Sequence, residues 1–464
     1  MLRTKLMAGL LLAVALGQGA GAQGIDEGDL EEWRAASEKT ASEKAMANAV
    51  QVSGIKALAL ANDNPIPGGT FFSNEVKSKG ITDQKNSGRC WLFTGLNVLR
   101  ARMIADYDLG EFTLSQNYVF FYDQLEKANL FLQSVIDLRN EPMDDRKVEW
   151  LFKNPLSDGG QFTGISDLIS KYGVCPSEVM KETAEANNTT VYSRLMKAKL
   201  REFGLKLRTM NDEGKDEKEL ENEKKSMLGE VYRMLTVCLG TPPEKFTWTR
   251  TDSKGKPVDT KEYTPLSFYE EYIGKDLKGG YLMFMNDPSR EYYKTYRIDL
   301  DRHVYDGEDW TFVNVPMEEI KSMAIESIKD STALYMSCDV NKFYNAANGY
   351  SDPGNYDYGG VLGTTFDMDK KARIETFTSG STHAMTLVAV DLDDKGEPRK
   401  WMVENSWGAT KGYKGHIIMS DEWLEGYLFR LVVEKKYIPA RLQRLAEEEP
   451  TLLPAWDPLY AGDE

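Results

Sequence analysis

The most informative stretch of this 464-residue chain is Gln84-Lys85-Asn86-Ser87-Gly88-Arg89-Cys90-Trp91-Leu92-Phe93. A loop over residues 81–89 leads into an apolar helix, one face of which carries apolar residues at helical spacing: Leu92, Leu96, Leu99 and Met103. We expect Asn86 or Ser87 to cap this helix, so that Cys90 falls in its first turn.

Cys90 is the first candidate for chemistry. At the start of a helix the dipole and the backbone N–H groups favour a thiolate, which is the reactive form of cysteine. Gln84, six residues upstream, can donate its side-chain amide to an oxyanion together with the backbone N–H of Cys90. A cysteine on an apolar helix is by default a small buried hydrophobe. The surrounding string of residues 84–93 favours the nucleophile instead.

A Cys–His mechanism must use one of the three histidines of the chain: His303, His383 or His416. His383 opens the apolar run 384–390, which a polar turn joins to a second run at 401–408. Two strands joined by a polar turn predict an antiparallel hairpin. If the hairpin is symmetric about residues 394 and 395, position 383 lies opposite 406 and beside Asn405, with a bulge shifting this by a residue or so.

The pairing of His383 with Asn405 is chemically useful. An imidazolium stabilises a neighbouring thiolate and then delivers its proton to the leaving amine. A carboxamide oxygen that accepts from the other ring nitrogen fixes the tautomer and the ring orientation. Trp407 has its side chain on the same side of the strand as Asn405 and is placed to shield their hydrogen bond from water. We expect His303 and His416 to be surface or structural residues.

These motifs resemble those of the papain-like cysteine peptidases, in the order Gln-x5-Cys-Trp, His-Ala and Asn-Ser-Trp-Gly. His383 lies 293 positions after Cys90, whereas about 130–150 is usual. The excess, mainly between Leu114 and Lys329, resembles one branch, that of bleomycin hydrolase and the bacterial aminopeptidase C. Further stretches fit this branch, among them Asp158-Gly159-Gly160-Gln161, Leu239-Gly240-Thr241-Pro242-Pro243 and Leu453-Pro454-Ala455-Trp456-Asp457-Pro458.

The resemblance implies an α+β, papain-like fold of two lobes, one helical and one an antiparallel β-barrel, with a large helical insertion and a C-terminal arm. It implies a cysteine aminopeptidase that cleaves peptides at free N-termini through an acyl-enzyme. Cys90 would be the nucleophile, His383 the base and acid, Asn405 the orienting residue and Gln84 the oxyanion donor. Alternatives are an endopeptidase of the same fold, or a catalytically silent binding protein.

The branch also implies a homo-hexamer with its active sites facing an internal chamber. In this branch the C-terminal arm lies in the cleft and its carboxylate pairs with the α-amino group of the substrate. We therefore expect Glu464, together with Trp407, to contact the substrate. The ending departs from the family, because Asp463 and Glu464 replace small or apolar residues.

Residues 1–22 are typical of a secretory signal peptide, with Arg3 and Lys5, an apolar run from Leu6 to Leu16, and small residues at Ala20-Gly21-Ala22. We expect cleavage after Ala22 and a periplasmic or secreted protein. The remaining boundaries that we predict are an N-terminal helical arm (23–69), a helical lobe with the nucleophile (70–113), a helical insertion with the rest of that lobe (114–330), a β-barrel lobe with His383 and Asn405 (331–440) and a C-terminal arm (441–464).

The bulk composition excludes some partners. The net charge of −16 argues against nucleic acid and against an anionic membrane surface, both of which need clustered Lys and Arg. We predict no cofactor and no metal. Asp391-Leu392-Asp393 faintly suggests a calcium loop, but Lys395 occupies its fifth position and a plain turn fits better. The four cysteines predict no disulfide framework in a chain of this size.

Overall fold

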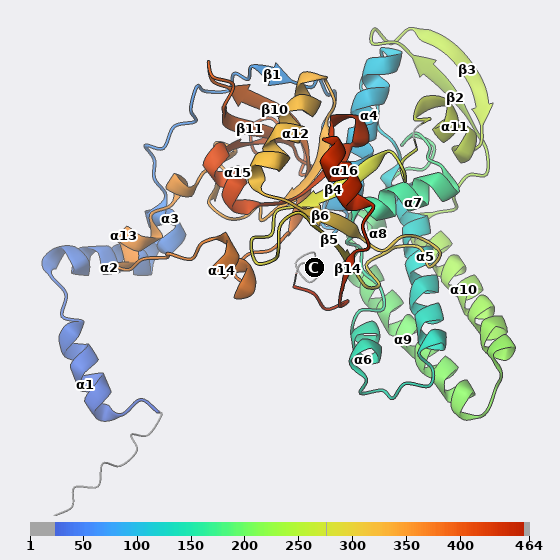
Figure 1. Ribbon diagram of the computed structural model, residues 1–464, viewed down its shortest axis with the longest axis horizontal. Coiled ribbons are helices and arrows are strands. Elements are labelled where there is room, and N and C mark those ends of the chain that lie inside the picture. Colours follow the sequence, from blue (N-terminus) through green and yellow to red (C-terminus); the bar gives the residue numbers. More distant parts are fainter. Residues whose placement is uncertain (1–23, 275, 459–464) are drawn as a thin grey trace, which may run out of the picture. The chain divides into compact units, whose positions relative to one another are not determined.

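The structure is a computed structural model that describes residues 24–274 and 276–458 (Figure 1). The predicted signal peptide and Glu464 lie outside the described residues. The chain divides into two compact units, of which one consists of residues up to Leu60 together with Asp357–Thr364. Its helices are α1 (Glu27–Ala36), α2 (Ala41–Ser53), α3 (Ile55–Ala59) and α13 (Tyr358–Leu362). Capping boxes at Asp26 and Thr40 begin α1 and α2.

The second unit, Ala61–Tyr356 with the chain from Thr365 onward, is built around a mixed sheet of 12 strands within the described residues. The strand order is β14-β5-β6-β4-β13-β7-β10-β11-β12-β9-β8, with β1 paired to β10. The strands are β1 (Asn74–Glu75), β4 (Tyr281–Met285), β5 (Lys294–Ile298), β6 (Thr311–Asn314), β7 (Leu334–Cys338), β8 (Tyr344–Asn345), β9 (Tyr350–Ser351), β10 (His383–Leu392), β11 (Pro398–Glu404), β12 (His416–Ser420), β13 (Leu428–Glu434) and β14 (Thr451–Leu453).

Helices on the N-terminal side of the sequence form the helical part of this unit. They are α4 (Cys90–Tyr107), α5 (Gln116–Asp137), α6 (Arg146–Lys153), α7 (Phe162–Tyr172), α8 (Ala184–Asn187), α9 (Thr190–Asp212), α10 (Glu217–Leu239) and α11 (Pro265–Tyr272). Long helices α5, α9 and α10 lie side by side in Figure 1 and pack on one another. Later helices follow the strands: α12 (Met317–Lys329), α14 (Lys370–Glu375), α15 (Asp421–Tyr427) and α16 (Ala440–Ala446).

Helix α4 connects the helical part to the sheet. It packs against α7 on one side and against β10 on the other. The residues that we predicted to form its apolar face are all buried: Leu92, Leu96, Leu99 and Met103. Because α4 begins at Cys90 and β10 begins at His383, this packing brings the start of the helix and the start of the strand into one region of the fold.

Two expectations for the architecture need correction. The sheet is mixed rather than purely antiparallel, because β4 pairs with β6, β5 with β14 and β9 with β12 in parallel. Five strands also fall within 114–330, for which the sequence indicated a largely helical pattern: β4, β5, β6 and a separate hairpin of β2 (Phe246–Thr251) and β3 (Pro257–Tyr263). Short apolar strands such as β4 have no periodicity that separates them from a buried helical turn.

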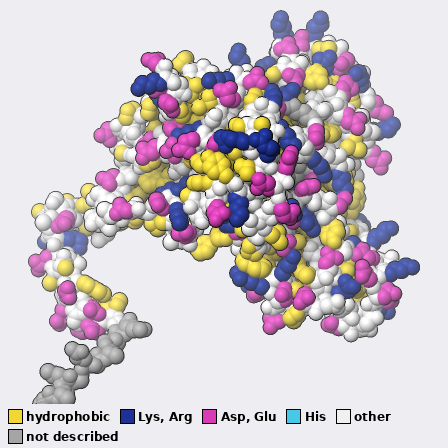
Figure 2. All heavy atoms as spheres, in the orientation of Figure 1, with side chains coloured by type: hydrophobic (Ala, Val, Ile, Leu, Met, Phe, Trp, Pro, Cys, Tyr) yellow, Lys and Arg dark blue, Asp and Glu magenta, His cyan; other side chains and the backbone are white. Residues whose placement is uncertain are grey.

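Charged side chains of both signs are interspersed over the face shown in Figure 2. Residues 191–235 are rich in charge and lie mainly in α9 and α10. Part of the apolar side chains of these helices is buried, among them Leu200, Leu207 and Leu235, and opposite charges meet at the surface, as in the 2.6 Å contact of Lys206 Nζ with Glu223 Oε1. None of the helices in the described residues is long and apolar enough to cross a membrane. The same residues contain no cluster of His, Cys, Asp and Glu that would hold a metal ion.

Candidate active site

Cys90 is the first residue of α4, and Arg89 precedes it without a side-chain cap. The expectation that Asn86 or Ser87 caps the helix is therefore wrong, although Cys90 does lie in the first turn. Ser87 is used within the loop instead: its Oγ donates to the carbonyl of Gln84 at 2.7 Å and accepts from Arg89 Nε at 3.1 Å. The loop that carries Cys90 is thus held by its own hydrogen bonds.

A second segment, residues 158–161, fixes this loop from outside. Asp158 Oδ2 accepts from the backbone N–H of Gly88 at 2.7 Å, and its carbonyl accepts from Trp91 Nε1 at 2.8 Å. Gly159 and Gly160 then line a small pocket together with Cys90. The other described residues that line this pocket are Gly88, Tyr335, Ser337, Thr382, Ala384 and Arg430.

His383 approaches this pocket from the sheet, since its neighbours Thr382 and Ala384 are among the lining residues. Its Nε2 donates to Asn405 Oδ1 at 2.8 Å, and both side chains are buried. Asn405 Oδ1 also accepts from the backbone N–H of Ser406 at 2.8 Å, which fixes the carboxamide. The structure therefore has the contact between His383 and Asn405 that the hairpin predicted.

The register of the hairpin explains how this contact arises. β10 and β11 are antiparallel, with Thr386 opposite Glu404 and Leu387 opposite Val403. An irregularity between Leu387 and Ala389 shifts the register by one residue relative to the pairs nearer the turn. Continued past the end of β11, the register places position 383 opposite 407 rather than 406. A bulge of this kind is what the prediction allowed for.

Burial controls the electrostatics of His383. Desolvation lowers the pKa of the imidazole to about 4, against which the hydrogen bond to Asn405 raises it. The ring of Trp407 lies 4.9 Å from the imidazole ring, centroid to centroid, at an angle of 30°. Trp407 therefore packs against the imidazole of His383, as expected of a side chain that keeps water away from it. Trp407 is not among the described residues that line the pocket of Cys90.

Gln84 is held at both ends of its carboxamide. Its Nε2 donates to the carbonyl of Ser87 at 2.6 Å, and its Oε1 accepts from Ser406 Oγ at 2.6 Å. Its backbone N–H also donates to the carbonyl of Ser406 at 2.8 Å. A carboxamide nitrogen carries two hydrogens, so the bond to Ser87 uses one of them and leaves a second donor on Nε2.

A comparison with known proteins identifies this arrangement. The Peptidase C1-like family matches residues 24–460. The chain belongs to this family. It is 38% identical over 431 residues to aminopeptidase E of Lactobacillus helveticus, covering 93% of this chain and 98% of that protein. It is also 38% identical to bleomycin hydrolase of Mus musculus, covering 84% and 88% of the two chains.

A solved structure of the family is similar over nearly the whole chain. The crystal structure of PepW from Lactobacillus rhamnosis superposes with a TM-score of 0.91 at 35% identity, covering 94% of this chain and 99% of that chain. The predicted papain-like α+β fold and the prediction of a cysteine-type peptidase are thereby confirmed.

Two features of this peptidase were missed from the sequence. The first is the hydrogen bond from Ser406 to Gln84. The one signal for it in the sequence was the position of Ser406 between Asn405 and Trp407 in the Asn-Ser-Trp-Gly motif. Arg100 of α4 and Glu404 of β11 form a buried ion pair that joins the helix of Cys90 to the strand that ends beside Asn405. No local pattern links positions 304 residues apart.

The other two histidines of the peptidase have different surroundings. His303 is buried, lies against Trp91 with ring centroids 4.6 Å apart, contacts Asp123 through Nδ1 and accepts from the backbone N–H of Gln161 at 3.2 Å. It is structural and not a surface residue. His416 is partly exposed at the start of β12. None of the four cysteines, which all lie in the described residues, is in a disulfide.

Proposed function

We propose that this peptidase is an exported aminopeptidase that releases residues from free peptide N-termini through an acyl-enzyme on Cys90. The observation that carries the proposal is the buried 2.8 Å hydrogen bond between His383 Nε2 and Asn405 Oδ1, beside the pocket that Cys90 lines. This bond fixes the tautomer with the proton on Nε2, so Nδ1 is the nitrogen that exchanges a proton with Cys90.

The proposed reaction has two steps. In acylation, His383 Nδ1 takes the proton of the thiol, Cys90 Sγ attacks the scissile carbonyl carbon, and the C–N bond breaks as His383 returns the proton to the leaving amine. In deacylation, His383 takes a proton from water as the water oxygen attacks the thioester carbonyl carbon. The C–S bond then breaks, the acyl group leaves as a carboxylic acid, and the proton on His383 returns to Cys90 Sγ. Gln84 Nε2 and the Cys90 backbone N–H stabilise the oxyanion in both steps.

Burial of His383 affects how the ion pair forms. Because its pKa is lowered to about 4, an isolated imidazole at this position is neutral at pH 7. The imidazolium then forms only when the negative charge of the thiolate arises beside it, so each charge supports the other.

Substrate hydrolysis by Cys90→Ala should be undetectable, and rapid alkylation by iodoacetamide at neutral pH should be confined to Cys90.

The aminopeptidase activity is supported by the relatives named aminopeptidase and by the base of the C-terminal arm. Asp457 accepts from Arg290 Nη2 at 2.9 and 2.7 Å, and the guanidinium of Arg146 lies 4.2 Å from the ring centroid of Trp456. An arm anchored in this way loses less entropy when its last residues, with Glu464 at the end, dock in the cleft.

The test compares two peptides of equal sequence, one with a free and one with an acetylated N-terminus. We expect the free peptide to be cleaved and the acetylated one to resist. Equal cleavage of both would favour an endopeptidase. Cleavage of neither, by a protein that is folded, would favour a silent binding protein.

Export and assembly complete the proposal. The sequence of residues 1–22 supports cleavage after Ala22, so that the exported protein begins at Gln23. A mass spectrum of exported protein that still contains residues 1–22 would refute this.

The family resemblance supports a homo-hexamer, and exposed apolar side chains on α9 and α10 are available for contacts, among them Leu195, Leu205 and Val237. A monomeric mass by light scattering at micromolar concentration would exclude it.

A further inference from the structure

The residue that precedes the nucleophile, Arg89, is a buried cation with several fixed partners. Its side chain is 0% exposed, and its two Nη atoms donate to the carboxylate of Glu182 at 3.2 and 2.7 Å. Its Nε donates to Ser87 Oγ at 3.1 Å. The guanidinium also lies over the rings of Phe93 and Phe120, 5.2 and 5.1 Å from their centroids. Burial of a cation is costly unless it is paired in this way, and these contacts hold Arg89 in one orientation.

Ser87 connects Arg89 to the proposed oxyanion donor. The Ser87 hydroxyl accepts from Arg89 Nε, and its single hydrogen is donated to the carbonyl of Gln84 at 2.7 Å. The carbonyl of Ser87 in turn accepts from Gln84 Nε2 at 2.6 Å. Since this bond uses one hydrogen of Nε2, the direction of the second hydrogen depends on where Ser87 lies.

The turn between Gln84 and Ser87 needs such support. Lys85 has a φ of 54°, in the left-handed region that residues with a side chain rarely adopt. Backbone in this region persists only where its surroundings hold it. Arg89 contributes to this, because its Nε fixes the hydroxyl that closes the turn.

Glu182 brings the helical insertion into contact with this turn. It lies just before α8, and Asn187 at the end of α8 accepts through its carbonyl from the backbone N–H of Asn86 at 3.0 Å. The segment is anchored on α5, where Asn117 Nδ2 donates to the carbonyl of Lys181 at 2.8 Å. The ion pair therefore ties the turn to the helices of the insertion.

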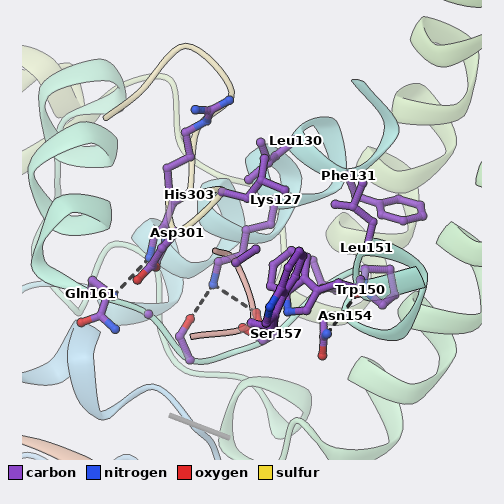
Figure 3. Close-up of a pocket in the computed structure, with 18 residues that line it drawn as sticks. Lys127, Leu130, Phe131, Trp150, Leu151, Asn154, Ser157, Gln161, Asp301 and His303 are labelled. Carbon is purple, nitrogen blue, oxygen red and sulfur yellow. Dashed lines mark hydrogen bonds between the residues drawn. The ribbon is translucent and has the colours of Figure 1, made fainter. Parts of the chain in front are cut away.

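The Cys90 end of the loop has a separate support. Asp158 Oδ2 accepts from the backbone N–H of Gly88 at 2.7 Å. The segment of Asp158 is held by Lys127, whose Nζ donates to the carbonyl of Ser157 at 3.1 Å (Figure 3). Because these contacts do not involve the guanidinium, loss of the ion pair should leave the nucleophile in place and move the oxyanion donor.

We propose that Arg89, fixed by Glu182, positions the oxyanion site. It does so through Ser87, which sets the direction of Gln84 Nε2. Arg89 is then a positioning residue, and the helical insertion has a part in catalysis through Glu182. The inference rests on the oxyanion role proposed for Gln84 and specifies which groups hold this donor.

The test is the double variant Arg89→Met with Glu182→Gln, which removes both charges and keeps an apolar side chain beside the rings of Phe93 and Phe120. Replacement of a buried ion pair in this way is often neutral for stability, so we expect unfolding in urea to match the wild type. With the free-amine peptide, we expect kcat to fall at least about 10-fold, because a displaced oxyanion donor stabilises the transition state less. The KM should change less than about 2-fold. An unchanged kcat in the folded variant would refute the inference.

The rate of Cys90 alkylation separates positioning from general damage to the site. In this reaction the thiolate displaces iodide from the CH2 group of iodoacetamide, so an S–C bond forms, a C–I bond breaks and no oxyanion develops. We expect the alkylation rate constant of the double variant to stay within about 2-fold of the wild type while kcat falls. An equal decrease in both would overturn the inference, because it would show that the pair acts on the nucleophile or on the fold.

A mutant cycle tests the route through Gln84. Gln84→Ala should lower kcat, and the Arg89→Met and Glu182→Gln changes should then add less than about 2-fold. Full additivity would refute this route. If kcat is unchanged in Gln84→Ala itself, the oxyanion role and the inference both fail. If kcat falls in Gln84→Ala and not in the double variant, only the inference fails.

Two further variants separate the ion pair from its charge. Arg250→Met with Asp259→Asn is the matched control, because it removes a 3.1 Å ion pair whose guanidinium lies 5.8 Å from the ring centroid of Tyr107, at the opposite end of α4. It should keep the kcat of the wild type. Arg89→Lys keeps the cation but loses Nε and the two-bonded geometry, so its kcat should be as low as that of the double variant. Full activity of Arg89→Lys would contradict the inference, because the charge alone would then suffice.

Ser87→Ala keeps the inference testable if the double variant does not fold. It retains the ion pair and removes the hydroxyl that links Arg89 to Gln84. We expect the same fall in kcat with an unchanged alkylation rate. A kcat equal to that of the wild type would show that Arg89 does not act through this hydroxyl.

Discussion

Replacement of Asn405 by alanine tests how His383 is oriented. Asn405 is 3% exposed, and its Oδ1 accepts from His383 Nε2 and from the backbone N–H of Ser406, both at 2.8 Å. The Asn405→Ala variant leaves a buried imidazole N–H without this acceptor, which costs about 1–3 kcal/mol. Because the imidazolium forms during the reaction, we expect most of this cost in the transition state, as a decrease in kcat of roughly 5- to 150-fold.

The pKa of His383 should move as well. The hydrogen bond to Asn405 raises this pKa against the effect of burial, so its loss makes the imidazolium still harder to form. Asn405→Asp is the matched control, because it keeps an acceptor of the same shape and adds a negative charge that favours the imidazolium. We expect the pKa of His383 in Asn405→Asp to lie above that in Asn405→Ala.

The assay is initial-rate kinetics on a free-amine peptide over a range of pH, with unfolding in urea to confirm that each variant is folded. The expected result for Asn405→Ala is a lower kcat with a nearly unchanged KM. A raised KM with intact kcat would refute the orienting role, because it would show that Asn405 contributes equally to the ground state and the transition state.

Three further predictions follow from the same contacts. Burial keeps the pKa of His383 at about 4 in the folded state, below its value of 6.5 when exposed, so the unfolded chain binds the proton first as the pH falls. The free energy of unfolding should therefore decrease by about 3 kcal/mol between pH 6.5 and 4 because of His383. Urea titrations of His383→Asn should lack this decrease. Ser406→Ala removes the donor to Gln84 Oε1 and should lower kcat roughly 5-fold, with no added effect in Gln84→Ala; additive losses would contradict the coupling. Arg100→Met leaves the buried carboxylate of Glu404 without its cation and should destabilise the fold by about 3–5 kcal/mol. The double variant with Glu404→Met should regain most of the lost unfolding free energy. A loss below about 1 kcal/mol for Arg100→Met, as expected of an exposed ion pair, would contradict this prediction.

Local signals in the sequence were sufficient for the elements that carry the chemistry. The apolar spacing of Leu92, Leu96 and Leu99 predicted α4, and the loop before it placed Cys90 in the first turn. The two apolar runs and their polar turn predicted the β10–β11 hairpin, and symmetry alone brought His383 beside Asn405. These inferences work because helix periodicity and hairpin pairing depend on residues close together in the chain.

Only the tertiary structure decided what surrounds these residues. Arg430 reaches the pocket of Cys90 because β13 pairs with β7, and Arg100 meets Glu404 because α4 packs on the sheet. Such contacts join positions hundreds of residues apart, and no periodicity encodes them. The cap of α4 was mispredicted for a related reason: the hydroxyl of Ser87 had two competing partners, and folding gave it to the loop and to Arg89. A local pattern states what a side chain can bond, whereas packing determines which of its partners is within reach.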